Sequence, residues 1–420
     1  MYKAYEIVGN PIIEGEITIQ GSKNSALAII CGALLCKGVV VLDNIPRIQD
    51  VFELLQILKK INVKFSLIDH QLMLDSSDIQ NQPLLFEEIK HFRASYYFIG
   101  VFLALFQNVE IYLPGGCKIG KRPIDQHLKG FSQLNIDFNI QNDIFKANSK
   151  QILGNEISLT IPSVGATINL ILASLLNKNT TIIKNAALEP EIIDFILFLK
   201  SMGAKIFGEG SSTIIISPSL NLHSTTYSIM PDRIVSGTYL LYGALLAKKL
   251  TLKNFKVKDN EALIHLLINM GANMDIKTNQ ITIYKMPSFK NAIVKTGVFP
   301  EFPTDLQQII TTMLFKGKQL SIVEENIFED RFLFLKQLQK IGGNYVILNN
   351  TVLIFPSSFE NGILNCEDLR GGAALLLAAM LAKGTSILKN VNYIERGYEN
   401  IVEILKNVHV QIKEINLHEA

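Results

Sequence analysis

The chain has 420 residues, of which 48% are hydrophobic and 19% charged, a composition that excludes a disordered or collagen-like protein. Forty basic residues against 38 acidic ones leave a net charge of +2, so no charge excess points to nucleic acid or an anionic membrane. Four unpaired cysteines, apolar runs too short for a bilayer and no signal-like N-terminus predict a cytoplasmic protein.

A short apolar pattern recurs six times along the chain. Its copies end at residues 38, 108, 179, 249, 317 and 384, so neighbouring copies lie 67 to 71 residues apart. Each copy is predicted to close an apolar helix on Gly, Asn or Lys, which suit a helix C-cap. A β-rich run such as residues 39–42 follows, then an amphipathic helix and two more strands, and a further strand leads in. The predicted unit is therefore a βαβαββ arrangement repeated six times.

Each predicted unit has two helices and four strands, enough for a sheet with helices packed on it rather than one turn of a solenoid. Its first helix is apolar nearly all round, as at 170–176, and should be buried. We therefore predict an α/β protein with three units in each of two domains. Domain I covers 22–230, and domain II covers 1–21 and 231–420. The opening strand, 16–19, is expected to complete the sheet of the last unit.

Polar residues gather where the six buried helices are predicted to begin. They are Lys23, Asn24, Arg93, Ser163, Thr167, Asp232, Arg233, Thr304, Asp305, Asp368 and Arg370. Capping of the helix explains Ser163, Thr304 and Asp368, and Asp232 fits the same role.

Capping does not explain Lys23, Arg93 and Arg370, because a cation at a helix N-terminus opposes the helix dipole. Such a residue is better tolerated when an anion sits between it and the helix, whose unpaired N–H groups also attract anions. We interpret the three as anion-binding residues, so the expected ligand carries phosphate or carboxylate groups.

The segment 115–125 is rich in glycine and lies between apolar elements, which indicates a flexible loop. Three basic residues follow Cys117 within five positions, and such a setting lowers the pKa of a thiol. A lone cysteine is usually a small buried hydrophobe, which fits Cys31 and Cys36 inside the first apolar helix, and also Cys366. Cys117 is instead predicted to be a nucleophile or proton donor.

Ten motifs in order along the whole chain resemble the enolpyruvyl transferase family. They lie at 21–24, 92–95, 113–123, 163–167, 189–191, 231–233, 302–305, 327–331, 368–370 and 395–398. Each motif alone is weak, whereas ten in the right order are specific. The resemblance implies two domains, each built from three copies of one unit, in an inside-out α/β barrel with the active site in the interdomain cleft.

The activity implied by the resemblance is transfer of the enolpyruvyl group of phosphoenolpyruvate to the 3′-hydroxyl of UDP-N-acetylglucosamine, with release of phosphate. This is the committed step of peptidoglycan precursor synthesis and hence of cell wall formation. The sequence has no His or Cys spacing typical of a metal site and no glycine-rich nucleotide-cofactor motif, so neither a metal nor a cofactor is expected. The substrates are the only partners expected, with no nucleic acid, membrane or obligate protein partner. Closure on nucleotide-sugar binding is expected, with 115–122 as the lid.

The resemblance also implies a role for individual residues. Cys117 would form a covalent adduct with phosphoenolpyruvate, serve as general acid and be alkylated by the epoxide fosfomycin. Asp305 would take the proton from the sugar hydroxyl, and Lys23 and Arg396 would complete the catalytic set. The residues implied to bind phosphoenolpyruvate are Lys23, Asn24, Arg122, Arg370 and Arg396. Those implied to bind the nucleotide sugar are Asn24, Arg93, Arg122, Pro123, Ile124, Asp125, Gln126, Ile161, Pro162, Ser163, Val164, Asp305 and Ile327.

Three positions depart from the family pattern, all on the nucleotide side. Ile161 stands where many relatives have a lysine, Gln126 replaces an apolar residue and Leu188 replaces a frequent arginine.

Two other functions remain open at this point. One is a family member that uses shikimate 3-phosphate as acceptor, and the other is a non-catalytic sensor of UDP-N-acetylglucosamine. The Gly-Gly-Cys loop and the motif at 302–305 favour the nucleotide-sugar enzyme over the first, and retention of the implied catalytic residues argues against the second.

Overall fold

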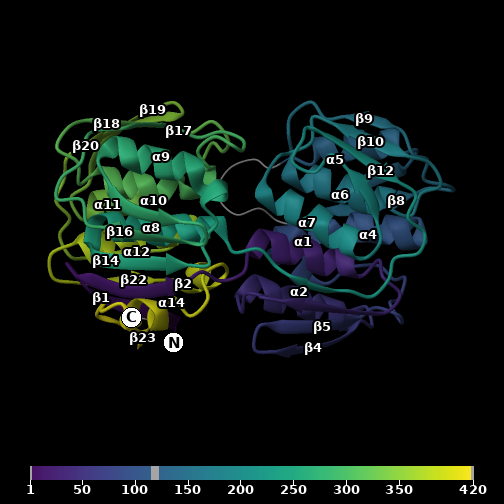
Figure 1. The fold of residues 1–420 in the computed structure, drawn as a ribbon, viewed down its shortest axis with the longest axis horizontal. Helices are drawn as coiled ribbons and strands as arrows, with labels where there is room; N and C mark the ends of the chain where they lie inside the picture. Colours follow the sequence, from purple (N-terminus) through teal and green to yellow (C-terminus); the bar gives the residue numbers. More distant parts are fainter. Residues whose placement is uncertain (1, 115–122, 418–420) are drawn as a thin grey trace. The chain divides into compact units, whose positions relative to one another are not determined.

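A computed structural model describes residues 2–114 and 123–417 of the protein, and these divide into two compact units (Figure 1). The N-terminal unit comprises residues 21–114 and 123–230, and the C-terminal unit comprises 2–20 and 231–417. Each unit has its own hydrophobic core. No helix of the described residues is long and apolar enough to cross a membrane.

The described strands form six sheets that repeat one pattern. In the third repeat, β9 (Glu156–Ser158) runs parallel to β10 (Thr181–Lys184), the strand that follows the buried helix. On its other side β10 is antiparallel to β12 (Thr213–Ser217), which pairs with β11 (Lys205–Phe207). Recurrence of this arrangement confirms the predicted α/β fold class with six copies of one unit.

The second repeat departs slightly from the pattern, since its sheet has three strands. These are β6 (Asn108–Tyr112), β8 (Ile144–Asn148) and β7 (Asp137–Gln141). A single parallel bridge between Leu84 and Ile111 takes the place of the strand that leads in elsewhere.

The first two strands complete different sheets from the one expected. β2 (Ile13–Thr18) is parallel to β14 (Ala247–Lys253) in the fourth repeat, so the prediction that 16–19 complete the last sheet is wrong. In the last sheet, β21 (Ile363–Asn365) already fills the parallel position. What that sheet lacks is the antiparallel strand between β22 (Thr385–Lys389) and β23 (Ile412–Leu417), and β1 (Tyr2–Val8) supplies it.

The N-terminal unit closes in a similar way, because β13 (Thr226–Ser228) returns to pair in parallel with β3 (Val39–Asp43) of the first repeat. The remaining strands are β4 (Lys64–Ile68), β5 (Gln71–Asp75), β15 (Asn273–Lys277), β16 (Gln280–Tyr284), β17 (Ile293–Lys295), β18 (Ser321–Glu324), β19 (Asn344–Leu348) and β20 (Thr351–Phe355).

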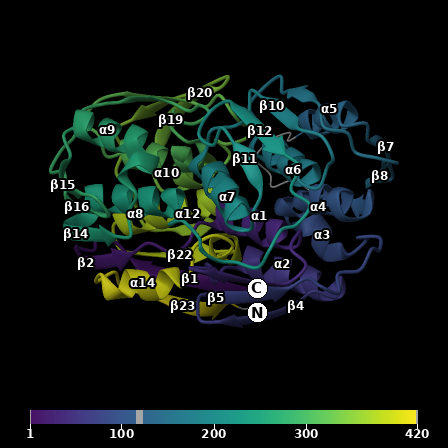
Figure 2. The same ribbon diagram turned by 45° about the vertical axis from the view of Figure 1, so that its right-hand side comes forward.

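Six apolar helices lie in the interiors of the units. They are α1 (Lys23–Ala33), α4 (Tyr97–Phe106), α6 (Val164–Ser174), α8 (Arg233–Leu246), α10 (Thr304–Leu314) and α12 (Leu369–Leu381). Figures 1 and 2 show α8, α10 and α12 side by side within the C-terminal unit, with sheets around them. The packing is close at Gly237, where an added Cβ would lie 2.4 Å from Cδ1 of Leu306 on the neighbouring helix and would force that side chain to shift.

These helices end two to five residues before the caps predicted for them, because a turn or the following strand begins there. The second helices of the repeats are α2 (Gln49–Lys60), α5 (Asp125–Gln133), α7 (Pro190–Ser201), α9 (Glu261–Met270), α11 (Leu335–Lys340) and α14 (Ile401–Asn407). Short helical segments are α3 (Glu87–His91), η1 (Arg93–Tyr96), η2 (Val257–Asn260) and α13 (Asn392–Glu395).

Candidate active site

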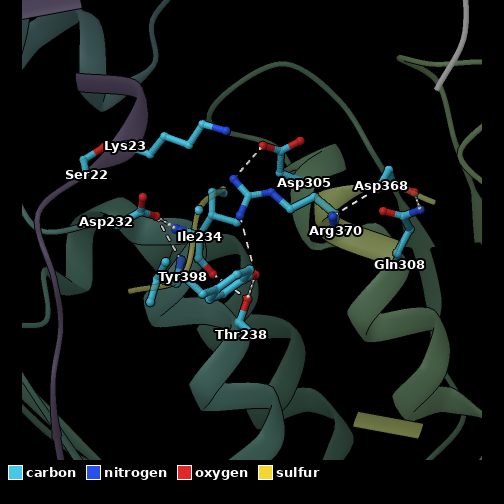
Figure 3. A network of polar contacts seen from close by, with 12 residues as sticks. Ser22, Lys23, Asp232, Ile234, Thr238, Asp305, Gln308, Asp368, Arg370 and Tyr398 are labelled. Carbon is cyan, nitrogen blue, oxygen red and sulfur yellow. Dashed lines mark hydrogen bonds and ion pairs between the residues drawn. The ribbon is translucent and has the colours of Figure 1, made fainter. Parts of the chain in front are cut away.

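The start of α12 places a buried arginine against a carboxylate of α10 (Figure 3). Asp368 caps the helix as predicted, because its Oδ1 accepts hydrogen bonds of 2.9 Å from the N–H groups of Arg370 and Gly371. Nη2 of Arg370 donates to Oδ2 of Asp305 at 3.1 Å, and its Nη1 donates to the hydroxyl of Tyr398 at 3.5 Å. Two residues predicted from helix starts 65 positions apart are therefore in direct contact.

The buried environment of Arg370 keeps its charge in place. Burial alone would lower the pKa of the guanidinium, but the negative charge of Asp305, with contributions from Tyr398 and Asp232, holds that pKa above its ordinary value. Arg370 is thus a fixed, largely desolvated cation, and such a cation interacts with an anion more strongly than one in bulk water.

Asp305 has a second guanidinium partner that the sequence analysis did not assign. Nη2 of the buried Arg331 donates to Oδ1 of Asp305 at 2.5 Å, and its Nη1 contacts Oε1 of Gln308 at 3.4 Å. The Asp305 side chain is still 29% exposed. Both carboxylate oxygens of Asp305 thus lie against a guanidinium group.

Glu325 organises the loop that carries Ile327. Its Oε1 accepts hydrogen bonds from the N–H groups of Ile327 and Phe328 at 2.9 and 3.1 Å, and from the hydroxyl of Thr304 at 2.9 Å. Thr304 therefore does not cap its helix, and that expectation is wrong. The N-cap position is Pro303, whose backbone is extended, and the helix begins only at Thr304.

Arg396 directly follows the short helix α13 and is half-buried. Tyr398, two residues further on, is buried, and its hydroxyl contacts both Arg370 and the hydroxyl of Thr238 on α8, the latter at 2.8 Å. The structure thus connects the segment of Arg396 to the Arg370–Asp305 pair through one tyrosine.

In the N-terminal unit, Lys23 is the first residue of α1, and Ser22 caps the helix by accepting from the N–H of Ser25 at 3.3 Å. Nζ of Lys23 lies 2.6 Å from Oδ2 of Asp50, and the two side chains are only 12% and 4% exposed. The protein itself therefore supplies an anion beside this cation, which the sequence analysis missed. Asn24 is the next residue and is half-buried.

Arg93 lies in η1, with its guanidinium carbon 5.1 Å from the ring centroid of Tyr96. The same tyrosine ring lies 5.8 Å from the ring of His127, a buried residue of α5 that the sequence analysis did not single out. Burial, helped by the positive charge of Arg93 and opposed by Asp125, lowers the pKa of His127 to about 4. The imidazole is therefore neutral near pH 7.

Hydrogen bonds join two of the segments implied to bind the nucleotide sugar. Oε1 of Gln126 accepts from the N–H of Thr160 at 2.8 Å, while its Nε2 donates to Asp125 at 2.7 Å. Nζ of Lys129 donates to the hydroxyl of Thr160 at 2.8 Å. Gln126, which departs from the family pattern, thus connects its own segment to the backbone just before Ile161. The side chain of Ile161, another departure, is 58% exposed.

The remaining residues of these segments lie close by in sequence. Pro123 and Ile124 precede α5, with Ile124 at its N-cap position. Pro162 is half-buried, and Ser163 caps α6 as predicted by accepting from the N–H of Ala166 at 3.3 Å. Val164, the first residue of α6, packs against the core of its unit.

Two predicted residues, Cys117 and Arg122, lie outside the described residues, as does the rest of 115–122. The other three cysteines, Cys31, Cys36 and Cys366, are buried, and burial raises the pKa of each thiol, which confirms their interpretation as buried hydrophobes. Cys36, however, lies beyond the end of α1 and not inside that helix as expected.

Two solved structures share the fold of the protein. The enolpyruvyl transferase NikO from Streptomyces tendae matches with a TM-score of 0.89 at 20% identity, over 98% of this chain and 99% of its own. An EPSP synthase from Acinetobacter baumannii matches with a TM-score of 0.74 at 15% identity, over 99% and 100%. The fold is that of the enolpyruvyl transferases.

Sequence comparison identifies the family to which the chain belongs. The model of the family EPSP synthase (3-phosphoshikimate 1-carboxyvinyltransferase) matches residues 9–405. UDP-N-acetylglucosamine 1-carboxyvinyltransferase 2 of Staphylococcus aureus (strain MRSA252) is 40% identical over 402 residues, 96% of each chain. UDP-N-acetylglucosamine 1-carboxyvinyltransferase 1 of Staphylococcus haemolyticus (strain JCSC1435) is 41% identical over 412 residues, 97% of each. The protein belongs to the EPSP synthase family, and the resemblance to the enolpyruvyl transferases is confirmed.

Proposed function

We propose that the protein transfers the enolpyruvyl group of phosphoenolpyruvate to the 3′-hydroxyl of UDP-N-acetylglucosamine, releasing phosphate, as the first committed step of peptidoglycan synthesis in the cytoplasm. The observation that carries the proposal is the contact between the buried Arg370 and the partly exposed Asp305. Together they offer an anion-binding cation and a proton acceptor side by side. Relatives at 40% and 41% identity, matched over nearly their whole length, bear the name of this activity.

Arg370 is suited to hold a substrate anion. Phosphoenolpyruvate has a phosphate and a carboxylate, and charge develops at its C2 when the enol double bond is attacked. Cations that are already fixed and desolvated stabilise such a transition state without reorganising. We assign phosphoenolpyruvate binding to Lys23, Asn24, Arg122, Arg370 and Arg396.

Asp305 is proposed to accept the proton of the 3′-hydroxyl. Both of its oxygens contact guanidinium groups, of Arg370 and Arg331. A substrate anion that binds Arg370 competes with Asp305 for the same guanidinium and releases Oδ2 as an acceptor. Arg331 meanwhile keeps the other oxygen in place. Binding of phosphoenolpyruvate and activation of the base are thereby coupled.

Cys117 is proposed to deliver the second proton, to the methylene carbon C3. Its covalent adduct with phosphoenolpyruvate forms when the sulfur adds to C2 and the thiol proton goes to C3, and the adduct reverses to thiol and phosphoenolpyruvate before the sugar oxygen adds. The addition step forms the bond between the sugar oxygen and C2 and adds a proton to C3. The elimination step breaks the bond between C2 and the phosphate oxygen and removes a proton from C3. The enolpyruvyl ether and free phosphate result, so no oxidant or reductant is required.

The nucleotide sugar is proposed to bind along the segments that Gln126 connects. The hydrogen bonds of Gln126 to Asp125 and to the N–H of Thr160 support this assignment, because they hold two loops in one arrangement before ligand binds. The residues assigned to this ligand are Asn24, Arg93, Arg122, Pro123, Ile124, Asp125, Gln126, Ile161, Pro162, Ser163, Val164, Asp305 and Ile327.

A phosphate-release assay with two acceptors tests the proposal. We expect phosphate from phosphoenolpyruvate with UDP-N-acetylglucosamine and none with shikimate 3-phosphate. Release with shikimate 3-phosphate alone would identify the other acceptor of the family. Binding of UDP-N-acetylglucosamine without phosphate release at any enzyme concentration would indicate a sensor and contradict the proposal.

A further inference from the structure

The carboxamide of Gln20 holds the backbone just after Arg396 from two sides. Its Nε2 donates to the carbonyl oxygen of Gly397 at 3.1 Å, and its Oε1 accepts from the N–H of Glu399 at 2.9 Å. The backbone of Gln20 is itself fixed, because its carbonyl oxygen accepts from the N–H of Asp232 at 2.9 Å. One side chain from the first 20 residues therefore satisfies both a donor and an acceptor of a segment more than 370 positions away.

This segment has little regular structure of its own to hold it. Helix α13 ends at Glu395, and Asn400 adopts a left-handed conformation (φ 43°) before α14 begins. Gly397 and Glu399 are buried, so their backbone groups need partners within the protein. The space around Gly397 is also tight, since an added Cβ would lie 2.8 Å from Cδ2 of Leu369, the residue before Arg370.

The residue on the other side of Arg396 is held by the same part of the chain. The carboxylate of Glu395 accepts from the hydroxyl of Tyr5 at 2.9 Å and pairs with Lys3, both on β1. Arg396 thus projects from a backbone that is fixed before it by β1 and after it by Gln20.

We propose that Gln20 is a positioning residue for phosphoenolpyruvate, because it fixes the backbone from which the Arg396 guanidinium reaches the substrate anion. The inference rests on the function proposed above. Loss of the carboxamide leaves the carbonyl group of Gly397 and the N–H of Glu399 buried without these partners. The segment then shifts or loosens, and the guanidinium loses its defined position. Productive binding of phosphoenolpyruvate weakens, whereas the nucleotide-sugar segments of the N-terminal unit are unchanged.

Gln20 could instead act only as a structural tether of the N-terminal segment, and a matched variant distinguishes that role from the positioning role. Nδ2 of Asn254 donates to the carbonyl oxygen of Ile19 at 3.0 Å. Asn254→Ala loosens the same segment one residue away and leaves both hydrogen bonds of the Gln20 side chain intact. A second variant, Gln20→Glu, retains the acceptor for Glu399 and loses the donor to Gly397.

The experiment compares kcat, both KM values and Tm of the full-length wild type, Gln20→Ala, Gln20→Glu and Asn254→Ala. Two lost hydrogen bonds to a binding segment predict that kcat/KM for phosphoenolpyruvate falls about tenfold in Gln20→Ala. kcat/KM for phosphoenolpyruvate also falls in Gln20→Glu, because a carboxylate oxygen then faces the carbonyl oxygen of Gly397. KM for the nucleotide sugar stays within about twofold of wild type in both variants. Asn254→Ala lowers Tm without changing either KM.

Three results would overturn the inference. They are an unchanged kcat/KM for phosphoenolpyruvate in both Gln20 variants, an equal rise of both KM values, and the same kinetic change in Asn254→Ala. If Gln20→Ala does not fold, kcat/KM for phosphoenolpyruvate in Gln20→Glu alone tests the inference. If the wild type releases no phosphate, both the proposed function and this inference are refuted. If the wild type is active and the Gln20 variants have its kinetic constants, only this inference is refuted.

Discussion

The two units each pair a cation at the start of a buried helix with an aspartate, yet the two pairs differ in how the carboxylate is held. Asp50 is 4% exposed and forms an ion pair with Lys23, whereas Asp305 is 29% exposed and lies between Arg370 and Arg331. A carboxylate that is almost wholly buried holds its cation in one place. A partly exposed carboxylate with a second arginine can release the first arginine and keep its own place.

Three cysteines are buried, and the fourth is predicted from the sequence to be reactive. Cys31 and Cys366 are fully buried, and burial raises the pKa of both thiols, so the reactive thiolate is disfavoured. Cys117 is predicted to be the reactive thiol because basic residues surround it in the sequence.

Removal of Asp305 is the sharpest test of this comparison. Asp305→Ala is expected to lower kcat by about 10³-fold, because the base for the 3′-hydroxyl is lost. Binding of UDP-N-acetylglucosamine, measured by calorimetry, should persist. Asp275→Ala, which removes an exposed carboxylate on β15, should keep the wild-type rate. Normal turnover in Asp305→Ala would exclude it as the base.

Alkylation by fosfomycin tests the contrast among the cysteines. Mass spectrometry of the treated protein is expected to show one adduct per chain, and Cys117→Ala should abolish it. Cys366→Ala serves as the control and should label like the wild type, because that thiol is buried. Labelling that persists in Cys117→Ala would assign the reactive thiol to another cysteine.

Asp50→Asn tests whether the carboxylate of Asp50 stabilises the fold as the partner of Lys23. Breaking a buried ion pair leaves Lys23 without its carboxylate, so the free energy of unfolding is expected to fall by about 3 kcal/mol in urea denaturation. The exposed pair of Lys64 and Asp78 provides the control, and Asp78→Asn should leave the free energy of unfolding nearly unchanged because solvent screens this pair. If Asp50→Asn changes the free energy of unfolding as little as Asp78→Asn does, Asp50 is not a structural partner of Lys23.

His127 gives the smallest predicted effect, and it depends on pH. Its pKa is lowered to about 4 in the folded protein, so the unfolded chain binds more protons between that value and the ordinary pKa of 6.5. The stability due to the neutral imidazole is complete above pH 6.5 and is lost as the pH falls toward 4. At pH 5 the loss is about 2 kcal/mol relative to pH 7. His127→Phe should remove this dependence, and His265→Gln, on the exposed face of α9, should keep it.

Much of the fold was predictable because its determinants are local. The six buried helices follow from apolar periodicity, and Ser163 and Asp368 cap them as their residue types predict. The sheet that each strand joins depends on long-range pairing, and this is where the prediction for residues 16–19 was wrong.

In the candidate site, too, local sequence signals could be predicted and long-range contacts could not. Arg370 and Asp305 stood out because each lies at a helix start, where a charge conflicts with or complements the dipole. Arg331 and Asp50 carry no such local signal. Their roles depend on partners 26 and 27 positions away, which only the folded structure brings into contact. Gln20 was missed for the same reason.

The pairing of β1 and β2 has a consequence for synthesis of the chain. Every strand of the three sheets in the N-terminal unit lies between residues 39 and 228. That unit can therefore complete its sheets while the ribosome is still translating the rest. By contrast β2 waits for β14, and β1 waits for β22 and β23. Strands β1 and β2 thus precede the whole N-terminal unit in the chain and pair only after that unit has been translated.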